Sequence, residues 1–180
     1  MRNLILLLVV TTSAFAQTRV RPAGPYANAA EMAIKQAAEA VGQQKKIVDR
    51  DLEVLSHLKA ADAALTDPMQ PENAVQKAYE EVDKAKSLGP DFSVAQGVIK
   101  MERELEAARR SPMSADFGRL RAHLSEWALG PAARVVTRNA LRLQEETLAW
   151  LRVQELISAH VRMMTEISGE SLRAVATSRE

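Results

Sequence analysis

Apolar residues recur every three or four positions along most of this chain, the spacing at which side chains share one face of an α-helix. The first long stripe covers residues 34–65 and the last covers residues 136–175, and neither contains a proline. Each stripe therefore predicts one long helix. The first is expected to begin near Asn28 and to stop before Pro68, and the last to run from about Ala132 to the end of its stripe.

Three shorter stripes lie between the two long ones, and each is bounded by residues that start or stop helices. Proline opens a helix or ends it, glycine closes it, and an aspartate or serine caps its N-terminus. On these signals the second helix is expected from Pro71 to Gly89, the third from Asp91 or Ser93 to Ser111, and the fourth from Ser114 or Asp116 to Gly130-Pro131.

These elements predict an all-α fold, a helical bundle of about five helices. At about 1.5 Å per residue the first helix exceeds 50 Å and the last approaches 65 Å. Only the first helix is long enough to cover much of the last, so we expect the two to form an antiparallel pair with the three short helices packed on their flank. The alternative is that part of the last stripe is reserved for a second copy, giving a homo-oligomer through the last helix.

The N-terminus has the three parts of a secretory signal peptide. Arg2 precedes an unbroken apolar run over residues 4–10, and the segment closes on Ala14-Phe15-Ala16. A membrane anchor needs roughly 18 apolar residues, and the polar residues 11–13 stop the run well short of that. We expect residues 1–16 to be cleaved after Ala16, residues 17–27 to form an extended or disordered leader, and residues 28–180 to form a single helical domain. The protein is then periplasmic or secreted.

Charge and cysteine content narrow the classes of partner. The chain has 24 basic and 23 acidic residues and no cysteine. Disulfides, thiolate metal sites and a lipoprotein anchor are therefore ruled out. The balanced charge gives no overall attraction to nucleic acid, and aromatic residues, 4% of the chain, do not interleave with the arginines. No later apolar run is long enough to span a bilayer, so no transmembrane segment is expected in the mature chain.

The sequence lacks the spacings on which common catalytic sites depend. It has no Glu-x-x-His pair of a di-iron bundle, no zinc-binding H-E-x-x-H helix, no G-x-S-x-G turn and no phosphate-binding glycine loop. We therefore expect neither an enzyme nor a cofactor; the remaining alternative is an enzyme whose site is assembled from scattered polar residues.

Arginines concentrate between residues 100 and 142, a segment that contains nine basic and five acidic residues. Arginine's planar guanidinium suits phosphates and carboxylates, so this segment predicts a basic partner-binding face. The alternative is that acidic helix faces of the same protein neutralise these groups. The residues expected to form the face are Arg119, Arg121, Arg134, Arg138 and Arg142.

His160, Met163 and Met164 form the most site-like cluster for a metal, because three- and four-residue spacings share one side of a helix. An imidazole beside thioethers is a plausible copper(I) donor set. The simpler interpretation is structural, since Met164 falls on the apolar stripe and methionine commonly fills gaps in cores. His57 and His123 lie on other helices, and the sequence does not place them.

The predicted signal peptide, the predicted all-α fold and the absence of catalytic motifs together predict an exported, non-catalytic helical binding protein of the cell envelope, an adaptor or holdase-like assembly factor. Its expected partner is a protein or an anionic envelope component. The alternative function is a periplasmic copper-binding bundle that uses His160, Met163 and Met164.

Overall fold

The computed structural model describes residues 25–66 and 69–177, so the predicted signal peptide lies outside the described residues. No strand occurs among them, and the prediction of an all-α fold is confirmed. The elements in chain order are α1 (Pro25–Ala64), α2 (Pro71–Ser87), α3 (Phe92–Arg110), the short 3-10 helix η1 (Pro112–Ser114), α4 (Phe117–Leu124), the π-helical turn η2 (Ser125–Leu129) and α5 (Gly130–Thr177).

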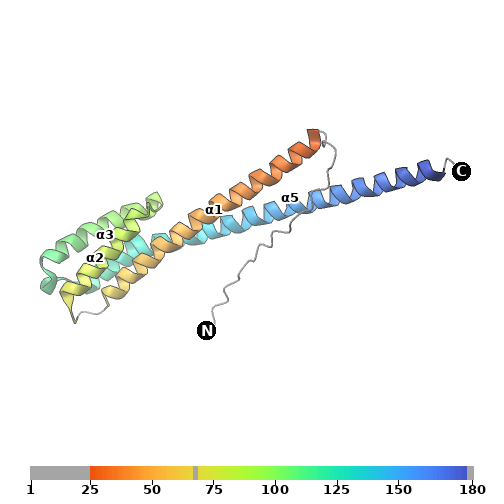
Figure 1. Cartoon of the computed structure of the whole chain (residues 1–180). Helices are drawn as coiled ribbons and strands as arrows, with labels where there is room; N and C mark the ends of the chain where they lie inside the picture. Colours follow the sequence, from red (N-terminus) through yellow and green to blue (C-terminus); the bar gives the residue numbers. More distant parts are fainter. Residues whose placement is uncertain (1–24, 67–68, 178–180) are drawn as a thin grey trace.

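The helices form an elongated molecule with a thick end and a thin end (Figure 1). The long helices α1 and α5 run side by side in opposite directions, and the shorter helices gather around one end of this pair. We call the thick end, residues 48–66 and 69–135, the head. The shaft is the remainder of the pair, residues 25–47 of α1 and 136–177 of α5. Toward its first residue α1 diverges from α5, and α5 extends beyond it (Figure 1).

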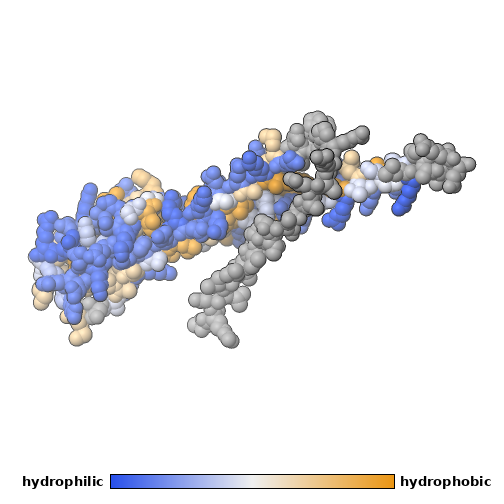
Figure 2. All heavy atoms as spheres, in the orientation of Figure 1, coloured by the Kyte–Doolittle hydropathy of each residue, from blue (hydrophilic) through white to orange (hydrophobic). Residues whose placement is uncertain are grey.

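The hydrophobic core of the described residues lies in the head, because only there do side chains from several helices meet. A shaft of two helices buries one seam and leaves the other faces in solvent. Figure 2 shows the result, with apolar residues reaching the surface along the shaft and a mostly hydrophilic surface over the head. The large core side chains that are completely or almost completely buried are Val54, Leu58, Leu65, Val75, Val82, Val94, Val98, Met101, Leu105 and Leu124.

Local capping signals explain several of the helix boundaries. The Asp91 carboxylate accepts a hydrogen bond from the Ser93 backbone N–H at 3.0 Å, and Asp116 accepts one from the Arg119 N–H at 2.9 Å. Each satisfies an amide in the first turn of its helix that has no partner within the helix. Gly89 follows α2 with a φ of 64°, a conformation that favours glycine after a helix. α1 begins at Pro25, three residues before Asn28.

The expected break at Gly130-Pro131 is wrong. α4, η2 and α5 form one continuous helix from Phe117 to Thr177, so the described residues contain four helices in place of five. In an α-helix the Pro131 ring would crowd the carbonyl of Trp127, four residues earlier. The π turn relieves this conflict because the Gly130 N–H donates to the Ser125 carbonyl, five residues back.

Tertiary packing holds this π turn in place. Gly97 of α3 lies so close to the turn that a side chain there would overlap the Trp127 carbonyl oxygen. The carbonyl that Pro131 cannot hydrogen-bond is therefore covered by the bare backbone of another helix.

A buried polar layer joins α1 and α5 where the head meets the shaft. The Asn139 Nδ2 donates to Asp51 Oδ2 at 2.7 Å, and the Asn139 carbonyl accepts from Gln44 Nε2 at 3.1 Å. The other Asp51 oxygen accepts from Arg50 Nη2 at 2.9 Å. Gln44 and Asp51 are both buried. Sliding either helix by one turn would leave these groups unpaired, so the layer favours a single register.

Candidate functional site

The five arginines expected to form one basic face lie in three separate places. Arg121 faces α1, where its Nε donates to Asp62 Oδ1 at 3.0 Å. Arg119 lines a groove between α3 and α4, together with Arg103 and Glu104. The other three lie along α5. The charge pattern identified exposed arginines, but the fold distributes them over the head and the adjoining part of the shaft.

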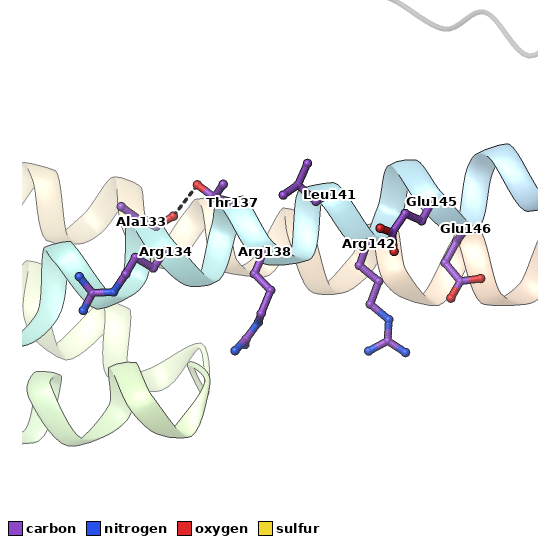
Figure 3. Close-up of a pocket in the computed structure, with 8 residues that line it drawn as sticks. All are labelled: Ala133, Arg134, Thr137, Arg138, Leu141, Arg142, Glu145 and Glu146. Atoms are coloured by element: carbon purple, nitrogen blue, oxygen red, sulfur yellow. Dashed lines mark hydrogen bonds between the residues drawn. The ribbon is translucent and has the colours of Figure 1, made fainter.

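Arg134, Arg138 and Arg142 form a row on α5, and Figure 3 shows their side chains pointing to the same side of the helix. We call this set the arginine row. Its four-residue spacing brings each guanidinium about one helical turn from the next, so the row spans about 12 Å. The row borders a shallow groove of about 770 Å³ that also contacts Ala133, Thr137, Leu141, Glu145 and Glu146. We call it the α5 groove.

The middle arginine of the row is held by the head. The Arg138 Nη2 donates to Asp91 Oδ2 at 3.2 Å, linking α5 to the start of α3. Hydrogen bonds from Ser93 lower the pKa of the Asp91 carboxyl, and the Arg138 charge lowers it further, while burial opposes both. The carboxylate therefore stays ionised and fixes the middle of the row.

The two outer arginines are available to a ligand. Among the described residues, neither the Arg134 nor the Arg142 guanidinium has a carboxylate within ion-pair distance or a hydrogen-bond partner, and both side chains are exposed. Internal neutralisation therefore accounts for Arg121 and Arg138 but not for the outer positions of the row.

The α5 groove combines apolar surface with both signs of charge. Leu141, with 57% of its surface exposed, projects beside the arginine row, and Glu145 and Glu146 follow the row along the helix. Arg142 and Glu146 also line a smaller groove of about 420 Å³ against Gln36 and other residues of α1. The surface therefore changes from basic to acidic within three helical turns. The sequence analysis missed Leu141, whose only signal is a large apolar residue among arginines on a polar face.

The proposed copper cluster lies on the last part of α5. His160, Met163 and Met164 are all exposed there, so Met164 is not a core residue. Nothing in the described part of the chain brings a second helix with further ligands to them, and it contains no group of three or more His, Cys, Asp or Glu residues that could hold a metal.

The other two histidines are held in the head and do not converge with His160. The His57 Nδ1 lies 2.7 Å from a Glu81 oxygen, and the His123 Nδ1 lies 2.7 Å from a Glu104 oxygen. The His123 ring also stacks on Trp127 at a centroid distance of 4.1 Å. Each pair joins neighbouring helices, α1 to α2 and α3 to α4. Hydrogen bonds from Lys84 and His57 lower the pKa of Glu81, against a smaller opposing effect of burial.

Comparison of the chain with protein families, with curated proteins and with solved structures finds no match. Within the described residues, no helix combines the length and the apolar character needed to cross a membrane. The α5 groove therefore has to be interpreted from its own chemistry.

Proposed function

We propose that this protein is an exported, non-catalytic binding protein of the cell envelope, with an adaptor or assembly role, and that it binds an acidic segment of a partner protein in the α5 groove. The observation that carries the proposal is the arginine row. Arg134 and Arg142 are exposed without ion pairs on either side of an Arg138 that Asp91 holds in place. A row of guanidinium groups whose middle member is held in place is suited to pair with carboxylates.

The composition of the groove favours a protein over a polyanion. Glu145 and Glu146 at one end would repel a continuous run of phosphates, whereas a protein segment can present acidic residues to the row and a basic residue to the glutamates. Leu141 gives such a segment an apolar contact that phosphates would not use. The location in the envelope follows from the predicted signal peptide at residues 1–16.

The test is site-specific crosslinking in living cells. A photoreactive residue in place of Leu141 is expected to capture a partner protein, identified by mass spectrometry after purification of the processed chain. Adding Arg134→Glu and Arg142→Glu is expected to reduce capture at least tenfold, because both free cations of the row become anions. The matched control is Arg103→Glu with Arg119→Glu, which makes the same change of charge on the groove between α3 and α4.

An equal loss of capture in the two double variants would show that overall charge, and not the row, governs binding. Unchanged capture by the Arg134→Glu, Arg142→Glu chain would overturn the proposal outright. Since both arginines are exposed, each substitution is expected to change the free energy of unfolding by no more than about 0.5 kcal/mol. The melting temperature of the double variant should then stay within about 4 °C of that of the unmodified chain, so that loss of capture cannot be assigned to misfolding.

A further inference from the structure

The last part of α5 presents an apolar face that no other described helix covers. Gln44 of α1 bonds to Asn139 of α5, and at equal rise along two antiparallel helices the first residue of α1, Pro25, then lies level with about residue 158. α5 continues from there to Thr177, about 28 Å further. Figure 1 shows this extension beyond the end of α1.

The exposed face continues the seam between α1 and α5. Leu143, Val153 and Ile157 are half-buried on the stripe where the two helices are paired. The same spacing places Val161 and Met164 on this stripe after α1 has ended. The large apolar side chains of this stretch that are more than half exposed are Leu156, Val161, Met163, Met164 and Ile167.

The charges of this stretch lie on the opposite side of the helix. Between residues 151 and 177 there are three arginines and three glutamates, and at 100° per residue they occupy an arc of about 80°. The large apolar side chains from Val153 to Ile167 occupy a separate arc of about 160°, in which His160 is the one titratable residue, and Leu151 lies between this arc and the charged one. A face this wide and free of formal charge is broader than a two-helix seam needs.

We propose that the part of this face centred on Met164 is the contact between two copies of the chain, which pair antiparallel through their α5 helices about a two-fold axis at Met164, with Met163 at the edge of the face. In this register Met164 meets its counterpart at the axis, and Val161 and Ile167 flank it on the two sides of the contact, level with Ile167 and Val161 of the other copy. The two-fold axis makes each contact occur twice, as a closed dimer requires. The proposal is independent of the partner site in the α5 groove.

The antiparallel direction follows from the shape of the molecule. A parallel copy would bring both heads and both α1 helices to the same end, where the seam is already occupied. An antiparallel copy places the heads at opposite ends, and its α5 reaches α1 only near the beginning of that helix. There α1 diverges from α5, so the second helix meets little obstruction (Figure 1).

Two other occupants fit the face less well. A membrane-surface helix carries an excess of basic residues on its polar face, whereas this polar face has three arginines and three glutamates and is neutral. Residues 17–24, which precede α1 after the proposed cleavage, contain two arginines and Val20 as their one large apolar residue, too little to cover it.

The mass of the signal-free chain, residues 17–180, is measured by sedimentation and light scattering over micromolar concentrations, and a dimer is expected. Met164→Glu is expected to raise the dimer dissociation constant at least 30-fold, because it opposes two carboxylates at the axis. Met163→Glu is the matched control: the same residue type, 55% exposed against 51% for Met164, points about 100° away. It is expected to have an effect of threefold or less.

Cysteine crosslinking tests the register without interference from native cysteines, since the chain has none. Met164→Cys is expected to oxidise to a disulfide-linked dimer, and Met163→Cys is not. Val161→Cys alone is not expected to crosslink. In the antiparallel register, two copies of residue 161 are about 9 Å apart along the axis, beyond the reach of a disulfide.

A monomer at all these concentrations would overturn the proposal, as would a dimer that Met164→Glu leaves intact. Crosslinking of Val161→Cys alone would show a parallel pair and overturn the register. Flotation of the chain with vesicles of phosphatidylglycerol and phosphatidylethanolamine, abolished by Met164→Glu in the absence of any dimer, would assign the face to a membrane surface.

Discussion

Replacing Gly97 by alanine reverses the usual effect of this substitution in a helix. Within a helix, glycine to alanine normally stabilises a protein by about 0.5–1 kcal/mol, because alanine loses less backbone entropy on folding. At Gly97, however, the new methyl group would overlap the backbone carbonyl of Trp127. A backbone group cannot turn aside as a flexible side chain can, so α3 and the π turn must move apart.

Such overpacking typically costs about 1–3 kcal/mol, more than the gain in helix propensity. We expect Gly97→Ala to lower the free energy of unfolding by about 2 kcal/mol, the middle of that range. For a chain of this size the melting temperature would fall by about 4–8 °C. The measurement is urea and thermal unfolding followed by circular dichroism at 222 nm.

Gly42 provides the matched control. It lies within α1, where a methyl group would meet no atom within 4 Å. Gly42→Ala is therefore expected to stabilise the protein by about 0.5–1 kcal/mol. If Gly97→Ala were as stable as the unmodified chain, or more stable, α3 would not lie against the π turn and the explanation given for the continuous helix would be refuted.

Three further predictions concern the polar contacts of the head and its junction with the shaft. Asp51→Ala removes the acceptor for Asn139 and is expected to lower the free energy of unfolding in urea by about 1–3 kcal/mol, since it leaves the partly buried Asn139 amide unpaired. Asp91→Ala is expected to lower the free energy of unfolding by about 1 kcal/mol through loss of the α3 cap, and Asp91→Asn to lower it much less, because asparagine also caps helices. A larger decrease for Asp91→Asn would mean that the ion pair with Arg138 contributes more than the cap. The pKa values of Glu81 and Asp91 are lowered in the folded protein, so their stabilising contribution is complete above about pH 4.5 and is lost as the pH falls through the folded-state values. The urea midpoint should therefore fall on acidification, and it should fall less steeply in Asp91→Asn. A midpoint that stays constant down to pH 3 would contradict this.

Most helix boundaries could be predicted because their signals are local. The first turns of α2 and α3 depend on Pro71 and Asp91, which act on backbone groups within a few residues. The break at Gly130-Pro131 was predicted by the same rule, but a glycine more than thirty residues away, Gly97, takes part in accommodating the proline. A contact between residues so far apart in the sequence cannot be predicted from a local pattern.

The candidate site could be predicted only where a single helix defines it. The four-residue spacing of Arg134, Arg138 and Arg142 places them on one face wherever the helix lies in the fold. Their relation to Arg119 and Arg121 depends on the π turn between them, and the ion pair of Arg138 with Asp91 depends on the packing of α3 against α5. Which arginines remain available to a ligand is therefore a property of the tertiary structure.

The π turn determines the direction in which the arginine row faces. A turn of this kind accommodates one residue more than an α-helix would over the same rise, and each residue of an α-helix rotates the chain by about 100°. If Ser125–Leu129 became α-helical with no change in sequence, α5 would turn by about that angle relative to α4 and α3. Arg138 would leave Asp91, and the row would point to another side of the molecule. The five residues of the π turn, inside the head, thus set the rotation of α5 and with it the direction of the proposed binding surface, which begins several residues further along the helix.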